Sequence, residues 1–300
     1  MAERQTTEHF ADRLLEAIEQ KGSPVCVGLD PVYERLPDVF GGEAETPQQR
    51  VEAIGRFCRE VLGVVAPIVP AVKLQIAYFE RYRDRGLRLY FELVACARQL
   101  GLIVIGDVKR GDIASTAQAY ADTHLLGTDA PDAITVNGYF GADGLEPFVR
   151  LCRAEGRGLF VLVRTSNASA AQIQDFSDGA GKKFYEHVAE QVAACGGGGL
   201  LGRRGYSCLG AVVAATYPDE ARRLRQIMPQ QIFLVPGYGA QGASAADCTA
   251  AFKPDGAGAV VNASRSIIFA HEKANRGGDW KRAVEDAAKA FADDIRNALP

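Results

Sequence analysis

Residues 102–136 read LIVIGDVKRGDIASTAQAYADTHLLGTDAPDAITV. An apolar, β-branched run from Leu102 to Asp107 predicts a buried strand, and residues 114–126 have helical periodicity. A second short apolar run follows from Ala133 to Val136. A strand, a helix and a further strand in this order predict parallel strands joined by a right-handed crossover.

The same unit recurs along the whole chain. The predicted strands are Val25 to Leu29, Ala71 to Leu74, Leu102 to Asp107, Ala133 to Val136, Leu159 to Val163, Leu209 to Val213, Ile232 to Val235 and Gly258 to Val261. The helix candidates lie near 47–65, 84–100, 114–126, 142–155, 180–194, 217–228, 243–252 and 279–298. Strands this apolar are expected to be covered on both faces.

These eight units predict an α/β fold of one kind, a single (β/α)8 barrel domain over residues 1–300. A charged, helix-like N-terminus (1–20) precedes it, and the stretch 165–207 is a long insertion after strand five, either a lid or a tolerated surface loop. A doubly wound open sheet is the alternative. It would want a GxGxxG turn after strand one, where the chain has Gly28-Leu29-Asp30-Pro31-Val32.

Composition excludes several classes of protein. With 47% hydrophobic and 24% charged residues, the chain has the proportions of a soluble globular protein. A net charge of −3 lacks the basic excess of a nucleic-acid binder, and no apolar stretch approaches the roughly 20 residues of a membrane span. Seven scattered cysteines read as free thiols of a cytoplasmic protein, and four widely spaced histidines argue against a metal site.

Because the active site of such barrels lies at the carboxyl ends of the strands, polar residues there are the candidates. They are Asp30, Lys73, Asp107, Lys109, Asp112, Asn137, Arg164, Thr165, Ser166, Gln241, Asn262 and Arg265. Two residues apart on a strand, Asp107 and Lys109 are expected on the same face, toward the barrel interior. Together with Lys73 they predict an alternating ion network. Carboxylates beside a lysine keep its amine protonated, which suits an acid that delivers a proton to carbon.

Plainer interpretations stay open for each of these residues. Asp112, Ser115 or Thr116 could cap the helix that starts near Ala114. Asp107 and Lys109 could be a structural pair at the rim, and Lys73 and Asp30 could be solvated strand ends.

The sequence also predicts a phosphate site on the far side of the barrel. Residues 236–242, PGYGAQG, form a glycine-rich loop between strand seven and a helix, and Arg265 follows strand eight. Alternatively, the glycines only permit a tight turn and Arg265 lies on the surface.

Taken together, these motifs resemble the orotidine 5′-phosphate decarboxylase family over essentially the whole chain. The family's Asp-x-Lys-x-x-Asp signature matches DVKRGD at 107–112, preceded by Lys73 in VKLQ and Asp30 in GLD. RTSN at 164–167, PGYGAQG at 236–242 and SRSI at 264–267 resemble its pyrimidine and phosphate segments, and the insertion resembles that of the longer bacterial branch.

The resemblance implies a cofactor-free, metal-free carboxy-lyase that converts orotidine 5′-phosphate to UMP and CO2 in pyrimidine biosynthesis. Lys109 would protonate C6 of the pyrimidine, Asp107 would crowd the substrate carboxylate, and Lys73 would hold the network. Asp112 would reach the neighbouring subunit of a homodimer. The remaining contacts would come from Asp30 and Thr116 to ribose, Ser166 to the pyrimidine, and Gln241 with Arg265 to phosphate.

One departure from the family and two alternatives accompany this reading. Ser264 stands where relatives commonly carry glycine, which affects the backbone contact to phosphate. A magnesium-dependent hexulose-phosphate synthase or ketogulonate-phosphate decarboxylase shares the signature. Those relatives have an acidic residue at the end of strand two to support the metal, whereas this chain has Lys73 in that region. A phosphate-binding barrel without catalysis is the third reading, which should have lost Lys109 or Asp107.

Overall fold

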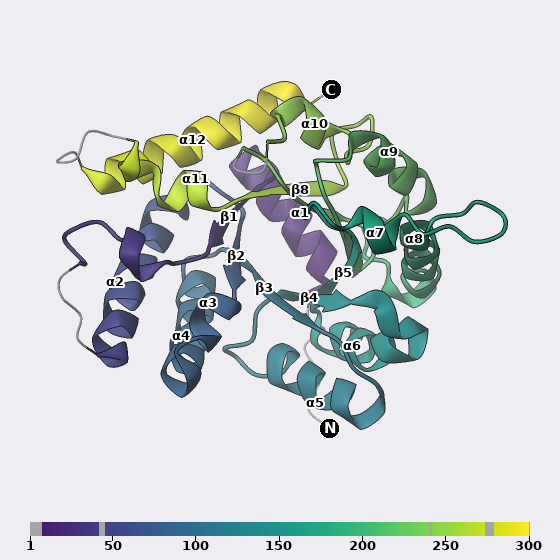
Figure 1. The fold of residues 1–300 in the computed structure, drawn as a ribbon, viewed down its shortest axis with the longest axis horizontal. Helices are drawn as coiled ribbons and strands as arrows, with labels where there is room; N and C mark the ends of the chain where they lie inside the picture. Colours follow the sequence, from purple (N-terminus) through teal and green to yellow (C-terminus); the bar gives the residue numbers. More distant parts are fainter. Residues whose placement is uncertain (1–7, 42–45, 240–241, 274–278, 300) are drawn as a thin grey trace.

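The computed structural model describes residues 8–41, 46–239, 242–273 and 279–299. Eight parallel strands form a closed barrel in chain order, with β8 paired to β1 (Figure 1). The strands are β1 (Val25–Leu29), β2 (Ala71–Gln75), β3 (Ile103–Arg110), β4 (Ala133–Asn137), β5 (Gly158–Arg164), β6 (Leu209–Val213), β7 (Phe233–Pro236) and β8 (Ala259–Ala263). The predicted barrel is confirmed, and the open sheet is wrong.

Helices alternate with these strands and surround the barrel (Figure 1). They are α1 (Phe10–Lys21), α2 (Pro47–Val65), α3 (Ala77–Glu80), α4 (Arg83–Gln99), α5 (Ala114–Leu125), α6 (Gly141–Glu155), α7 (Ala171–Gln174), α8 (Phe184–Cys195), α9 (Pro218–Ile227), α10 (Ala245–Thr249), α11 (Arg265–Ile268) and α12 (Trp280–Ala298). Four 3-10 turns are η1 (Tyr33–Arg35), η2 (Gly138–Phe140), η3 (Gly198–Leu200) and η4 (Ala270–Glu272). The short α3, α7 and α11 were not predicted, because four residues give no periodic signal.

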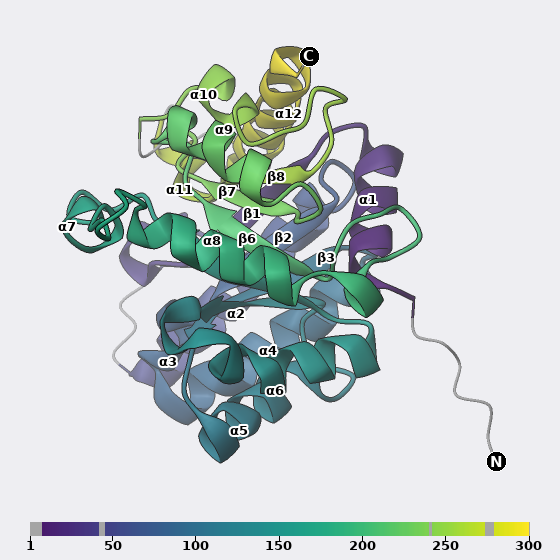
Figure 2. The same cartoon turned by 90° about the vertical axis from the view of Figure 1, so that its right-hand side faces the viewer.

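Helix α1 lies on the side of the barrel opposite α7, as Figure 2 shows. Its Phe10 packs edge-on against Phe160 of β5, with ring centroids 5.9 Å apart. A Cβ at Gly158 would lie only 2.2 Å from the Phe10 ring, so the first residue of β5 has to be glycine. The predicted N-terminal helix therefore closes the amino end of the barrel, and residues 1–7 lie outside the described part.

The insertion after β5 divides into two parts around α8. Residues 165–183, which include α7, project from the face where the strands end (Figures 1 and 2). Residues 196–208 lead back to β6 and contact α1, since the two carboxylate oxygens of Asp12 accept the backbone N–H groups of Arg203 and Arg204, each at 3.0 Å. The insertion thus reaches both ends of the barrel.

Candidate active site

The centre of the candidate site is the carboxylate of Asp107 on β3. Its Oδ1 accepts hydrogen bonds from Lys109 Nζ at 2.5 Å and Thr135 Oγ1 at 2.9 Å. Its Oδ2 accepts from Lys73 Nζ and from Gln75 Nε2, both at 2.9 Å. Four donors therefore hold one carboxylate that is only 6% exposed.

A second carboxylate extends this network. Asp30, which follows β1, lies 3.8 Å from Lys73 Nζ through its Oδ1. The charges alternate from Asp30 through Lys73 and Asp107 to Lys109. The part from Lys73 to Lys109 is the network that the sequence predicts, and Asp30 extends it. The structure brings these four residues together, so Lys73 is buried at 5% exposure and is not a solvated strand end.

Opposite charges determine the protonation states in this network. Burial alone would raise the pKa of Asp107, but Lys73 and Lys109 hold it well below its usual range. Burial likewise opposes the charge on Lys73, yet Asp107 and Asp30 raise its pKa above the ordinary lysine value. At neutral pH the Asp107 carboxylate is ionised and the Lys73 amine is protonated.

The backbone at Lys109 is unusual. Strand β3 runs three residues past the predicted end at Asp107, and its pairing with β4 shifts register between Gly106 and Arg110. Within this bulge Lys109 adopts a left-handed φ of 46°, which costs a non-glycine residue about 1 kcal/mol or more. The side chain of Lys109 is 46% exposed and its amine contacts Asp107, so the bulge places a charged amine at the open face.

Two residues of the network were not among the candidates from sequence. Thr135 on β4 is 1% exposed, donates to Asp107 and accepts the backbone N–H of Lys109 at 3.0 Å. Gln75, the last residue of β2, is the other. A polar residue within the apolar run at 133–136 was the available signal for Thr135.

Asp112 and Thr116 are separate from this network. The N-cap of α5 is Ile113, with no side-chain capping bond, so the alternative that Asp112, Ser115 or Thr116 caps this helix is wrong. The Asp112 carboxylate accepts only the N–H of Ile113, at 2.8 Å, within the described part of the chain.

Large apolar side chains are exposed beside Asp112. Ile113 is 54% exposed, Tyr139 71%, Phe140 41% and Tyr120 37%. All four belong to α5, to η2 or to the turn before α5. A cluster of this kind on one side of a molecule is typical of a protein interface.

The end of β8 carries buried polar atoms without partners. The buried Oδ1 of Asn262 and Oγ of Ser264 make no hydrogen bond among the described residues. An ideal Cβ on Gly28 would lie 2.8 Å from the Cβ of Ser264, and 3.3 Å from that Asn262 oxygen. The serine that departs from the family's usual glycine therefore occupies space that Gly28 leaves empty on β1.

Of the predicted phosphate residues, the structure describes Arg265, which lies just after β8. Arg265 begins α11, is exposed, and has no ion-pair partner among the described carboxylates. Gln241 lies outside the described residues. Gly239 adjoins the β8 side, because a Cβ there would lie 3.9 Å from Ser266 Oγ, so the two loops meet. The N–H groups of Gly239 and Gly242 are bonded to carbonyls of the loop itself.

Ser166 and its neighbours follow β5. Ser166 is half-buried, and its side chain makes no hydrogen bond within the described residues. Arg164, a strand-end candidate from sequence, is instead 1% exposed and lies against Tyr217 of the segment before α9. Asn137 at the end of β4 accepts the N–H of Tyr139 at 3.0 Å and so shapes the turn η2.

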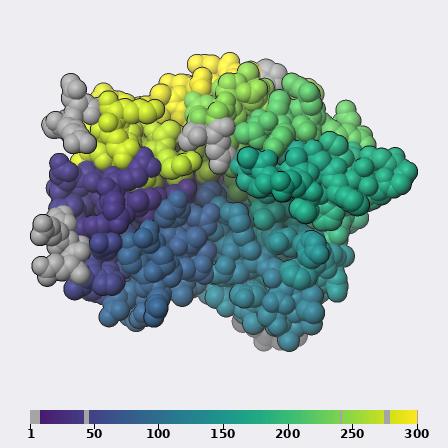
Figure 3. Space-filling view, viewed as in Figure 1, coloured from purple at the N-terminus to yellow at the C-terminus, as the bar shows by residue number. Residues whose placement is uncertain are grey.

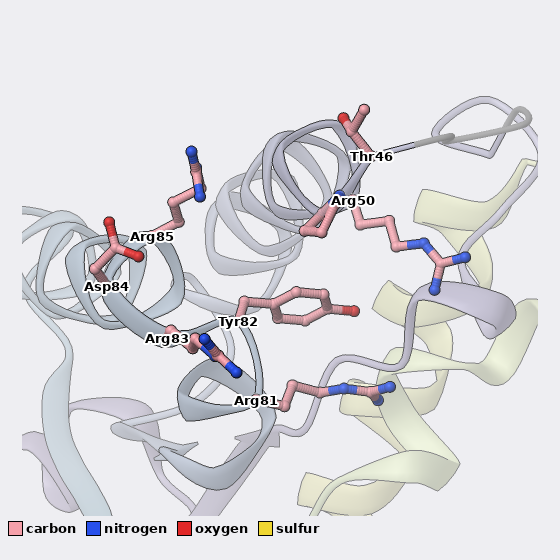
Figure 4. A pocket seen from close by; sticks show the side chains of 8 residues that line it. Thr46, Arg50, Arg81, Tyr82, Arg83, Asp84 and Arg85 are labelled. Atoms are coloured by element: carbon pink, nitrogen blue, oxygen red, sulfur yellow. The ribbon is translucent and has the colours of Figure 1, made fainter.

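A separate pocket of about 630 Å³ lies between the start of α2 and the α3–α4 turn. Figure 4 shows the Tyr82 ring between the side chains of Arg50 and Arg81. Arg83 in the same pocket has a φ of 55°. None of the four ion-network residues lines this pocket, so it is not the candidate active site.

The described part of the chain shows neither a metal cluster nor a membrane-spanning helix. Residues 8–41, 46–239, 242–273 and 279–299 contain no group of three or more His, Cys, Asp or Glu that could hold a metal ion. Within the same ranges no helix combines the length and apolar character needed to cross a bilayer. All seven cysteines are free, and five of them are buried.

The fold and the site define a class of protein, a (β/α)8 barrel with an Asp–Lys–Asp–Lys network at the carboxyl ends of its first three strands. Figure 3 shows the surface of the molecule in the view of Figure 1. Residues 23–277 match the family model described as the orotidine 5′-phosphate decarboxylase / HUMPS family. The chain belongs to this family, as its motifs predict.

Known relatives agree with that assignment. The chain is 45% identical over 292 residues to the orotidine 5′-phosphate decarboxylase of Rhodopirellula baltica, covering 93% of this chain and 96% of the relative. It is 37% identical over 290 residues to the enzyme of that name from Clostridium perfringens, covering 97% and 99%. The solved structure of Leishmania donovani OMP decarboxylase superposes with a TM-score of 0.75 at 30% identity, covering 97% and 98%. These relatives are carboxy-lyases by name, and the predicted enzyme class is confirmed.

Proposed function

We propose that this protein decarboxylates orotidine 5′-phosphate to UMP and CO2, with Lys109 as the proton donor to C6. The observation that carries the proposal is the contact between the amine of Lys109 and the ionised Asp107 at the open face. Loss of CO2 leaves an electron pair on an sp² carbon, and a fixed ammonium group beside that carbon stabilises the charge as it forms. Transfer of the ammonium proton to C6 then completes the product.

Asp107 and Lys73 have supporting roles in this mechanism. The Asp107 carboxylate keeps Lys109 oriented and would lie against the substrate carboxylate, a repulsion that is relieved when CO2 departs. Lys73 compensates the charge of Asp107 and has a further N–H group for a ribose hydroxyl, with Asp30 beside it. Binding energy from base, ribose and phosphate would hold these charges together.

The remaining substrate contacts in this proposal are those that the family resemblance implies. Ser166 would meet the pyrimidine with its unpartnered hydroxyl, and Arg265 with Gln241 would bind the phosphate. The buried, unpartnered oxygens of Ser264 and Asn262 provide further polar groups near the proposed phosphate site. Because Gly239 and Gly242 already use their N–H groups within the loop, Arg265 supplies most of the positive charge there.

We further propose a cytoplasmic homodimer in which Asp112 and Thr116 complete the site of the neighbouring subunit. The Asp112 side chain makes no hydrogen bond or ion pair with the network of its own chain, and exposed large side chains lie on α5, on η2 and in the turn before α5, namely Ile113, Tyr120, Tyr139 and Phe140. Burial of such side chains between two subunits would drive association.

The deciding experiment follows the ultraviolet absorbance of orotidine 5′-phosphate with the purified protein. We expect turnover that persists in excess chelator, and Lys109→Ala should lower kcat by several orders of magnitude while UMP still binds. Near-normal turnover by Lys109→Ala would exclude this lysine as the proton donor.

The two alternatives from sequence predict other outcomes. A magnesium-dependent enzyme of the same barrel would lose all decarboxylation in chelator. The Lys73 amine on β2 argues against such an enzyme, because it would repel a cation placed beside it. A binding protein would show UMP affinity with no turnover at all.

A further inference from the structure

Arg164, the last residue of β5, carries a full charge at 1% exposure. A buried charge is destabilising unless it is paired. Its Nη1 lies 2.9 Å from Asp175 Oδ1, and its Nη2 lies 3.7 Å from Glu220 Oε1. The guanidinium carbon lies 3.9 Å from the ring centroid of Tyr217 and 5.1 Å from that of Tyr185. One side chain therefore joins β5 to the insertion and to α8 and α9.

The same guanidinium group is connected to the turn that contains Ser166. Arg164 Nη1 donates to Gln174 Oε1 at 3.4 Å, and that oxygen also accepts the N–H of Thr165 at 3.1 Å. Gln174 Nε2 donates to Thr165 Oγ1 at 2.7 Å, and this hydroxyl donates to Asn167 Oδ1 at 2.7 Å. Ser166 is thus held on both sides, while its own hydroxyl has no partner within the described chain.

We propose that Arg164 and Gln174 are positioning residues for recognition of the pyrimidine base, which gives the first part of the insertion a role. Gln174 and Asp175 are consecutive residues at the end of α7, and Arg164 binds both. The insertion therefore sets the position of the Thr165–Asn167 turn, and with it the Ser166 hydroxyl. A turn ordered before the ligand arrives loses less entropy on binding.

This proposal rests on the proposed function, in which Ser166 meets the base. Arg164 itself touches no expected substrate atom, because its guanidinium group lies between the barrel and helices α8 and α9. Its effect would therefore be specific to the base part of the ligand. A purely structural role would instead affect every ligand alike.

Gln174→Ala is the test variant, since it removes the bonds to Thr165 and leaves Arg164 paired with Asp175. Gln172→Ala is the matched control, because Gln172 lies on the same short helix, is exposed, and has no side-chain hydrogen bond within the described residues. Calorimetry would measure the dissociation constants of UMP and of ribose 5-phosphate, which lacks the base.

We expect Gln174→Ala to weaken UMP binding by about three- to tenfold and to leave ribose 5-phosphate binding unchanged. Gln172→Ala should change neither. Ser166→Ala should also weaken UMP alone, and the double variant Ser166→Ala/Gln174→Ala should bind UMP no worse than the weaker single variant. Arg164→Met should resemble Gln174→Ala where it folds.

Equal losses for both ligands, or additive losses in the double variant, would overturn the positioning role. Unchanged UMP affinity in Ser166→Ala would overturn it too, since the turn would then position nothing that the base contacts. Failure of the proposed function looks different, because the wild-type protein itself would then not convert orotidine 5′-phosphate, whatever its affinity for UMP.

Discussion

At the scale of single residues, the carboxylate of Asp107 has the largest effect on its surroundings. It compensates two lysines and accepts a hydrogen bond from each of four side chains. The two-residue spacing of Asp107 and Lys109 predicted that they would share a face. The sequence did not predict the bulge that produces this contact, nor Thr135, because a polar residue in an apolar strand can face either side of the sheet.

Replacing Asp107 with asparagine should destabilise the protein by about 3 kcal/mol at pH 7, since Lys73 stays buried next to a neutral amide. The folded pKa of Asp107 is lowered, so its ionised form stabilises the fold above about pH 4, and this contribution is lost as the pH falls further. Urea unfolding across this range measures the difference. A gap between wild type and variant that stays constant down to pH 2 would contradict the assigned pKa shift.

The close approach of Gly28 on β1 to the Ser264 side chain can also be tested, because a side chain at position 28 should be tolerated only if Ser264 is made smaller. Gly28→Ala places a Cβ 2.8 Å from the Cβ of Ser264, so we expect a loss of about 1–3 kcal/mol in the free energy of unfolding. Ser264→Gly in the same chain should restore most of it, because the space is vacated. Thermal unfolding of both single variants and the double variant tests this, and strictly additive effects would rule out the contact.

At the scale of elements, the sequence predicted the helices between and after the strands that are longer than five residues to within a few positions, because amphipathic periodicity is a local signal. The helix-like stretch 1–20 was too wide, since α1 begins only at Phe10. The insertion was recognised only as surplus length. Its function in the fold depends on contacts with residues far away in the sequence, such as Asp12 with Arg203 and Arg204, and no local pattern records them.

Substitution of Asp12 tests whether the second part of the insertion, residues 196–208, stabilises the fold through its contact with α1. It is 4% exposed and holds two backbone N–H groups of the 202–204 turn, so Asp12→Ala leaves both without their acceptor. We expect a loss of about 2–3 kcal/mol in unfolding free energy with an unchanged KM, since the residue lies at the amino end of the barrel. A changed KM with unchanged stability would contradict this view.

At the scale of the whole molecule, the prediction that residues 1–300 act as one domain stays a prediction, and so does the dimer. Mixing two inactive variants tests the dimer directly. Each proposed site combines Lys109 of one chain with Asp112 of the other. In a mixed dimer of Lys109→Ala and Asp112→Ala chains, one site therefore contains both substitutions and the other contains neither. Refolding the variants together should therefore recover roughly a quarter of wild-type activity. Recovery no greater than the sum of the separate variants would show that Asp112 acts within its own chain.

The position of α1 has a consequence for the order of folding. During synthesis this helix emerges well before its partners, which include Phe160 of β5 and the turn at Arg203 and Arg204, about 150 to 190 residues later. Such contacts have a high sequence separation and form slowly. We therefore expect the apolar face of α1 to stay exposed until most of the barrel has been made, which leaves that helix as the segment most open to chaperones or to aggregation in the nascent chain.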